Sequence, residues 1–218
     1  MTSQRQTLAK PGPVFFIGRA VLRPLLRIRF RPRITGREHV PKAGPVLLVS
    51  NHLSGIDTIL IPSFAPRKVQ FLAKESLFGT RIGGWFFRQI GAIPVRREAS
   101  AAAQAALDAG REVLAAGSVF AVFPEGTRSR DGRLQPGKAG AAWLALETGA
   151  AVVPVGLVGT NRKLQNPGTG RAEPMSIAFG RPIDLSDLAA LPGGRARREA
   201  TARIMAAIQG LTGQDLAE

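Results

Sequence analysis

Short apolar runs alternate with longer stretches of helical periodicity along most of this 218-residue chain, and this alternation constrains the fold more than any other feature. Runs bounded by glycine, proline or charged residues indicate buried strands. Strands are expected at residues 45–50, 69–72, 91–95, 118–123, 152–158 and 175–179. Helices are expected at residues 56–64, 78–89, 99–116, 138–148 and 196–211. This order predicts an α/β fold with a mostly parallel central β-sheet flanked by helices.

The chain is strongly basic, with 30 Lys and Arg residues against 15 Asp and Glu residues, a net charge of +15. Such a charge favours an anionic partner: duplex nucleic acid, a membrane surface or a phosphorylated substrate. Aromatic residues make up only 6% of the chain, which argues against a base-stacking surface for single-stranded nucleic acid. The absence of cysteine excludes disulfides, cysteine metal sites and a thiol nucleophile.

Much of the charge lies near the N-terminus, where residues 14–30 combine bulky apolar residues with arginines spaced four apart. We interpret this stretch as a cationic amphipathic helix that lies in a membrane interface, with its arginines at anionic lipid phosphates. The expected lipid contacts are Arg19, Arg23, Arg27, Phe15, Phe16, Leu22 and Leu26. The alternative is a helix that packs its apolar side on the domain while its arginines are merely solvated.

The same stretch also bears on the location of the protein. A membrane-spanning helix needs about 20 mostly apolar residues, and no segment of the sequence meets that requirement. The arginines also break any signal-peptide pattern. We therefore expect a peripheral protein on the cytoplasmic face of the cell membrane. It would have a basic amphipathic helical arm at residues 1–40 and an α/β domain at residues 41–218.

Two segments that follow predicted strands carry reactive side chains, and ligands gather beyond the carboxyl ends of parallel strands. In the first, His52 leaves an apolar run directly into a turn and Asp57 follows five positions later. If His52 lies in the turn and Asp57 in the first turn of the next helix, the carboxylate can bond one ring nitrogen. The other nitrogen can then remove a proton from a hydroxyl group. No G-x-S-x-G sequence supplies a serine nucleophile, so that hydroxyl is expected to belong to the substrate.

Asp57 has a simpler alternative role. The sequence from Ser54 to Asp57 resembles a capping box in which Asp57 replaces the usual Glu or Gln. Ser54 is then a candidate N-cap, and Asp57 would serve only the end of the helix.

The second segment, residues 123–130, ends a predicted strand with a proline, bends at Gly126 and presents Arg128 and Arg130. Glycine lets the backbone approach a ligand, and paired arginines suit a phosphate. Residues 91–97 deliver two arginines in the same way. Beside His52, these segments describe an anion cradle next to a proton-abstracting pair, although each alone could be a solvated basic loop.

In order and spacing, these segments resemble four motifs of the glycerolipid acyltransferase family, whose familiar members convert lysophosphatidic acid to phosphatidic acid. The motifs are N-H-x-x-x-x-D at residues 51–57, G-x-I-x-V-x-R at 91–97, F-P-E-G-T-R-S at 123–129 and a V-P-V strand at 153–155. The resemblance covers about residues 45–180. One such motif is a weak signal, whereas four in order are specific.

The resemblance implies transfer of a fatty acyl group from an acyl thioester, either acyl-CoA or acyl-ACP. The acceptor would be a hydroxyl of lysophosphatidate or glycerol 3-phosphate, in phospholipid biosynthesis. It makes His52 a general base oriented by Asp57, with direct attack on the thioester and without a metal or bound cofactor. The residues implied to bind the substrate are Lys74, Arg97, Glu125, Gly126, Thr127 and Arg128.

Two other hypotheses follow from the basic charge: a nucleic-acid-binding protein and a non-catalytic lipid-binding domain. The strongest basic cluster is interleaved with bulky apolar residues, which a helix that follows a phosphate backbone does not need. We therefore expect no nucleic-acid partner. A lipid-binding domain would keep the anion cradle but show no turnover.

Overall fold

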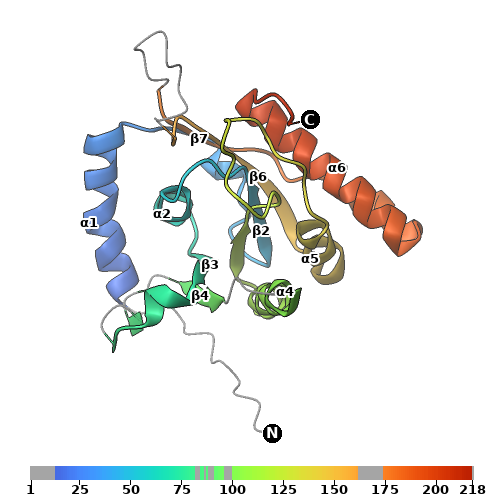
Figure 1. The fold of residues 1–218 in the computed structure, drawn as a ribbon, viewed down its shortest axis with the longest axis horizontal. Coiled ribbons are helices and arrows are strands. Elements are labelled where there is room, and N and C mark those ends of the chain that lie inside the picture. Colours follow the sequence, from blue (N-terminus) through green and yellow to red (C-terminus); the bar gives the residue numbers. More distant parts are fainter. Residues whose placement is uncertain are drawn as a thin grey trace, which may run out of the picture.

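The computed structural model describes residues 13–81, 84–85, 87, 91–95, 100–161 and 174–217. Its strands form one seven-stranded sheet with helices on both faces (Figure 1). The strands are β1 (Arg33–Thr35), β2 (Val46–Ser50), β3 (Val69–Lys74), β4 (Ala92–Val95), β5 (Val119–Val122), β6 (Ala151–Val158) and β7 (Ser176–Phe179). The α-helices are α1 (Pro13–Phe30), α2 (Asp57–Phe64), α4 (Ser100–Ala115), α5 (Gly140–Thr148) and α6 (Gly193–Thr212). Short 3-10 helices are η1 (Arg37–His39), η2 (Glu75–Phe78) and η3 (Ser186–Ala190).

The strand order across the sheet is β1-β7-β6-β2-β5-β3-β4. The five strands from β6 to β4 in that order run parallel, β7 runs antiparallel to β6, and β1 runs parallel to β7. The predicted α/β fold with a mostly parallel sheet is therefore confirmed. β1 was not predicted, because it is only three residues long and only Ile34 packs against the core.

The central strand β2 shows how the sheet separates two cores. All five of its residues are buried, and neighbours along the strand face opposite sides. Val46 and Leu48 join the core beneath α1 and α2, whereas Leu47 and Val49 join the core beneath α4, α5 and α6. Figure 1 shows these two groups of helices on opposite sides of the sheet. Burial on both faces explains why this strand reads as a continuous apolar run.

Most predicted helices lie within a few residues of their expected bounds, as α2, α4, α5 and α6. α5 and α6 end where Gly149 and Gly213 adopt left-handed conformations, with φ of 60° and 65°. The helix expected over residues 78–89 falls partly outside the described residues, but residues 81, 84, 85 and 87 are helical.

One face of α1 packs on the end of α2. The guanidinium groups of Arg19 and Arg23 donate hydrogen bonds to the backbone carbonyl oxygens of Ala65 and Ser63 respectively. Leu26 lies on the same side of α1 and is only 6% exposed within the core. The inward face of α1 is therefore built from two arginines and an apolar anchor.

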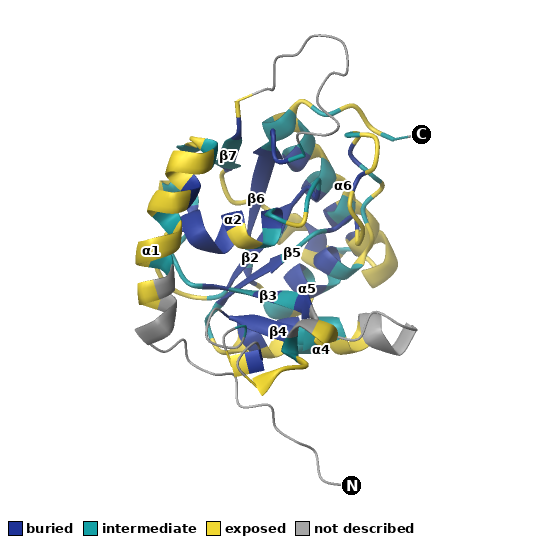
Figure 2. Cartoon of the chain, turned by 60° about the vertical axis from the view of Figure 1, so that its left-hand side comes forward, coloured by how far each residue is buried: buried dark blue, intermediate teal, exposed yellow. Residues whose placement is uncertain are grey.

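The opposite face of α1 is apolar and exposed, as Figure 2 shows in yellow. Ile17, Val21, Leu25 and Ile28 are 56–75% exposed. The arrangement reverses the expected one: Arg19, Arg23 and Leu26 turn towards the domain, because α2 offers free carbonyls there and the core accepts Leu26. The alternative is contradicted for Arg19 and Arg23, which bond to the domain, and for the exposed apolar side of the helix.

The other predicted lipid contacts and the domain boundary can be placed as well. Phe16, Leu22 and Arg27 are exposed, whereas the side chain of Phe15 lies outside the described part of the chain. Within the stretch assigned to the arm, residues 33–35 form β1, so the sheet begins before residue 41. No helix in the described ranges has both the length and the apolarity to cross a bilayer.

Candidate active site

Neighbouring strands bring the two predicted segments together. β2 and β5 are parallel neighbours, so their carboxyl ends lie at the same edge of the sheet. Residues 51–57 follow β2, and residues 123–130 follow β5. The backbone N–H of Ser129 donates to the carbonyl oxygen of His52 over 2.8 Å, which joins the two loops directly. Segments far apart in sequence thus form one site.

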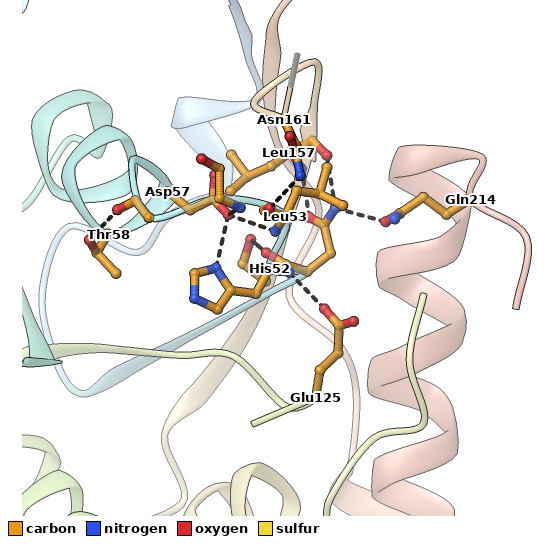
Figure 3. Close-up of polar contacts among 12 residues, drawn as sticks. His52, Leu53, Asp57, Thr58, Glu125, Leu157, Asn161 and Gln214 are labelled. Carbon is orange, nitrogen blue, oxygen red and sulfur yellow. Dashed lines mark hydrogen bonds and ion pairs between the residues drawn. The ribbon is translucent and has the colours of Figure 1, made fainter. Parts of the chain in front are cut away.

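His52 and Asp57 meet as the turn geometry predicts. His52 lies in the turn after β2, and Asp57 is the first residue of α2. Nδ1 of His52 lies 2.9 Å from Oδ2 of Asp57 (Figure 3). Asp57 is fully buried, whereas His52 keeps 8% of its surface exposed. The pair therefore has a buried carboxylate and an imidazole at the surface of the site.

Asp57 also organises the backbone of the turn. Its Oδ2 accepts hydrogen bonds from the backbone N–H groups of Leu53 and Ser54, each over 2.7 Å (Figure 3). The bond from Ser54 is the carboxylate half of a capping box. The expected N-cap role of Ser54 is wrong, because Ile56 occupies the N-cap position and no side chain caps α2. Asp57 thus serves the helix end and contacts His52 through the same oxygen.

The His52 ring is held on a second side by Phe123. The two rings stack with centroids 3.9 Å apart and an angle of 12° between their planes. Stacking and the bond to Asp57 together fix the plane of the imidazole. Nε2 of His52 has no hydrogen-bond partner among the described residues, so it is the nitrogen available to a ligand.

Glu125 forms a clamp between two loops. Its Oε1 accepts the backbone N–H of His52 over 2.7 Å, and its Oε2 accepts the backbone N–H of Gln135 over 2.9 Å. Burial raises the pKa of the Glu125 carboxyl, while these two N–H donors act in the opposite direction. Since Glu125 is only 2% exposed, it acts on the backbone around His52 rather than on the surface of the site.

Positive side chains flank the exposed loop that follows Glu125. Gly126, Thr127 and Arg128 are all exposed. Nη1 of Arg128 lies 4.0 Å from where a Cβ on Gly55 would be, so its guanidinium reaches the turn that contains His52. A Cβ on Gly126, which has φ of 69°, would lie only 2.9 Å from Nζ of Lys138. One cation therefore reaches the turn that contains His52, and a second lies against Gly126 at the start of the loop.

Two predicted substrate-binding residues cannot be placed in the same detail. Lys74 is the last residue of β3 and pairs in register with Val95 of β4, but only its backbone is described. Arg97 lies outside the described residues. Among the residues that are described, no three His, Cys, Asp or Glu side chains are grouped as metal ligands.

The sequence assigned no role to Phe123, Gln135 or Lys138. Phe123 belongs to the F-P-E-G-T-R-S segment, so a signal was present in the motif. Gln135 acts at Glu125 through its backbone N–H, which every residue except proline carries, so its identity gives no signal. Lys138 reaches the loop only through the fold, because its own backbone N–H bonds to the carbonyl of Pro124.

Comparison with known proteins gives a family match that includes the residues of this site. The family model described as "Acyltransferase" matches residues 31–158, which include β1 to β6 and both loops of the site. The chain belongs to the acyltransferase family. A solved family structure, the 1-acyl-sn-glycerophosphate (LPA) acyltransferase PlsC from Thermotoga maritima, has a TM-score of 0.65 and 26% identity to this chain. The match covers 91% of this chain and 78% of that one, which confirms the fold.

Curated relatives of this acyltransferase-family chain carry 1-acyl-sn-glycerol-3-phosphate acyltransferase names. The chloroplastic enzyme of Arabidopsis thaliana is 37% identical over 134 residues, which are 61% of this chain and 37% of the relative. The enzyme of Borreliella burgdorferi is 36% identical over 129 residues, which are 59% of this chain and 51% of the relative. The match thus spans about half or less of the length of these relatives.

Proposed function

We propose that this chain transfers an acyl group from an acyl thioester to a hydroxyl of a glycerol phosphate acceptor, lysophosphatidate or glycerol 3-phosphate. The observation that carries the proposal is the His52–Asp57 pair, which lies in a turn that the Arg128 guanidinium reaches. The names of the relatives support the same reaction class and a role in phospholipid synthesis.

His52 acts as the general base. With the Nδ1 proton donated to Asp57, Nε2 carries the lone pair that accepts the proton of the acceptor hydroxyl. The hydroxyl oxygen attacks the thioester carbonyl carbon directly, and a tetrahedral intermediate forms. When the intermediate collapses, the carbon–sulfur bond breaks and the thiolate takes the proton from His52. The products are an ester and a free thiol, and His52 is regenerated.

Arg128 binds the acceptor phosphate. Its guanidinium can form paired hydrogen bonds to phosphate oxygens, and it reaches the turn beside His52. The exposed backbone at Gly126 and Thr127 shapes the floor of this site. Lys74 and Arg97 are further candidates for the same phosphate, as the family resemblance implies. This arrangement would hold the phosphate while the acceptor hydroxyl meets Nε2.

The donor is acyl-CoA or acyl-ACP. Either one supplies an activated acyl group on sulfur, so the transfer needs no bound cofactor. In both cases the reaction converts the donor to a free thiol. An assay of the released thiol therefore reports turnover with either donor.

The protein works at the cytoplasmic face of the membrane as a peripheral protein. The exposed apolar face of α1 enters the interface, and Phe16 and Leu22 extend it. Arg27 is exposed near the end of α1, where it can meet anionic headgroups. We retain Arg27 as a lipid contact and replace Arg19, Arg23 and Leu26 with Ile17, Val21, Leu25 and Ile28.

The reaction is tested with purified protein, radiolabelled lysophosphatidate or glycerol 3-phosphate, and acyl-CoA or acyl-ACP. The wild type is expected to form labelled ester, and His52→Ala is expected to lose a factor on the order of 10² to 10⁴ in rate. Equal product from the two proteins would remove His52 from the mechanism. Vesicle binding without turnover by the wild type would instead favour a lipid-binding domain.

A further inference from the structure

We propose that Gln214 is a positioning residue that fixes the His52 turn and the arginine loop relative to one another. The arginine loop is defined here as residues 126–133. The role assigned to it rests on the proposed function, because Arg128 in this loop is the phosphate contact. Gln214 follows α6, outside the residues that match the family model.

One end of the Gln214 side chain bonds to Asn51, the residue before His52. Asn51 is fully buried, and its side-chain amide pairs with the backbone of Leu157 in β6. Its Oδ1 accepts the Leu157 N–H and its Nδ2 donates to the Leu157 carbonyl, each over 2.8 Å. One N–H of the amide remains, and it donates to Oε1 of Gln214 over 2.7 Å (Figure 3). Gln214 therefore completes the hydrogen bonding of a buried amide next to the base.

The other end of the Gln214 side chain bonds to the arginine loop. Nε2 of Gln214 donates to the backbone carbonyl of Gly132, in the arginine loop, over 2.6 Å. Gln214 thus bonds to the residue before His52 and to the loop that carries Arg128. With the Ser129 N–H bond to His52, two separate links hold the loop to the turn.

The position of Gln214 is itself well fixed. Gly213 ends α6 in a left-handed conformation, and the chain then pairs with Leu134. Leu134 donates its N–H to the carbonyl of Asp215 over 2.8 Å, and its carbonyl accepts the N–H of Ala217 over 2.9 Å. A short strand-like contact therefore presents Gln214 to Asn51 and Gly132 in one orientation.

Removal of the side chain should act on the acceptor more than on the donor. In Gln214→Ala, the Asn51 amide keeps its bonds to Leu157 but loses its third partner, and Gly132 loses its link. The arginine loop is then less well placed to hold a phosphate beside Nε2. The acceptor KM should rise on the order of tenfold, while the donor KM stays near the wild-type value. A purely structural residue would lower the melting temperature without this split.

The test compares Gln214→Ala, Gln214→Glu and Gln104→Ala in two measurements. The first is the KM for lysophosphatidate and for the acyl donor. The second is backbone hydrogen exchange of peptides covering residues 50–54 and 129–135, which needs no turnover. Gln104→Ala is the matched control, because it removes an exposed glutamine of α4 that bonds to Asp108 on the same helix.

In Gln214→Ala, exchange should rise in both peptides. In Gln214→Glu, the carboxylate can still accept from Asn51 but cannot donate to Gly132, so exchange should rise mainly in residues 129–135. The proposal is overturned if Gln214→Ala leaves exchange and acceptor KM unchanged, or if Gln104→Ala reproduces its effects. A wild type that transfers no acyl group defeats the proposed function, and the exchange comparison still decides the role of Gln214.

Discussion

The two ends of α2 are completed by side chains of opposite charge. At the N-terminal end, the Asp57 carboxylate accepts backbone N–H groups and the His52 ring. At the C-terminal end, Arg19 and Arg23 donate to backbone carbonyls. Helix ends leave such groups without partners, and the sign of the helix dipole favours this distribution of charge. One short helix therefore connects the proposed base to the proposed docking helix.

The largest expected effect comes from the N-terminal end. Asp57→Asn removes the carboxylate that orients the His52 ring, so kcat should fall on the order of 10²-fold or more. The measurement is steady-state turnover with lysophosphatidate, together with the melting temperature. Ser54→Ala is the control, because the Ser54 hydroxyl has no partner in the described structure whereas its backbone N–H remains. Normal kcat with a lowered melting temperature would mean that Asp57 only closes the helix end.

The next effect concerns the outer face of the docking helix. Ile28→Asp places a charge at a position that is 75% exposed, so folding should be little affected. Because burying an isoleucine side chain contributes about 1.5–3 kcal/mol, binding to anionic vesicles should weaken on the order of tenfold or more. Vesicle flotation measures this. The control is Gln104→Asp, which adds the same charge at an exposed position of α4. Equal losses of vesicle binding from the two variants would indicate a non-specific charge effect.

A smaller effect is expected at the C-terminal end of α2. Arg23→Gln removes a charged donor from the Ser63 carbonyl, which should lower the free energy of unfolding by about 1 kcal/mol. Urea denaturation measures the change. Arg27→Gln removes the same charge from the exposed side and should leave the free energy of unfolding unaltered, while it weakens vesicle binding. If the two variants behave alike, Arg23 does not connect α1 to α2 as the contacts indicate.

The smallest expected effect is a change in how the free energy of unfolding depends on pH. It comes from Glu125, which bonds to the backbone of His52 near the N-terminal end of α2. Burial raises the pKa of Glu125 above its ordinary value of 4.5, so the folded state binds the proton more tightly than the unfolded state. The resulting stability is present below pH 4.5 and is lost as pH rises through the raised pKa. Glu125→Gln should remove this decrease from the pH profile of the unfolding free energy. In the control variant Glu112→Gln, which changes an exposed glutamate, the decrease of the unfolding free energy with pH should remain.

Local patterns predict the sheet and the His52–Asp57 contact because each depends on neighbouring residues. β2 reads as a strand because both its faces are buried, and His52 meets Asp57 because the four residues between them form a turn. The inward direction of Arg19 could not be predicted, since helical spacing identifies a face but not which face is covered. The partner of Arg19, Ala65, is the residue that follows α2 and is 46 positions away in the sequence. Gln214 gave no signal for the same reason, because only the fold brings it to Asn51.

The connection between α1 and β1 determines how the protein can sit on a bilayer. Only Arg31 and Pro32 separate the last residue of α1 from the first residue of β1. The three Cα–Cα steps from Phe30 to Arg33 extend at most about 11 Å, so α1 has little independent reach. A docking helix with such a short connection cannot hold the domain at a distance from the membrane. In the proposed docking, the sheet and its candidate active-site edge would therefore approach the lipid surface together with α1, as a single body.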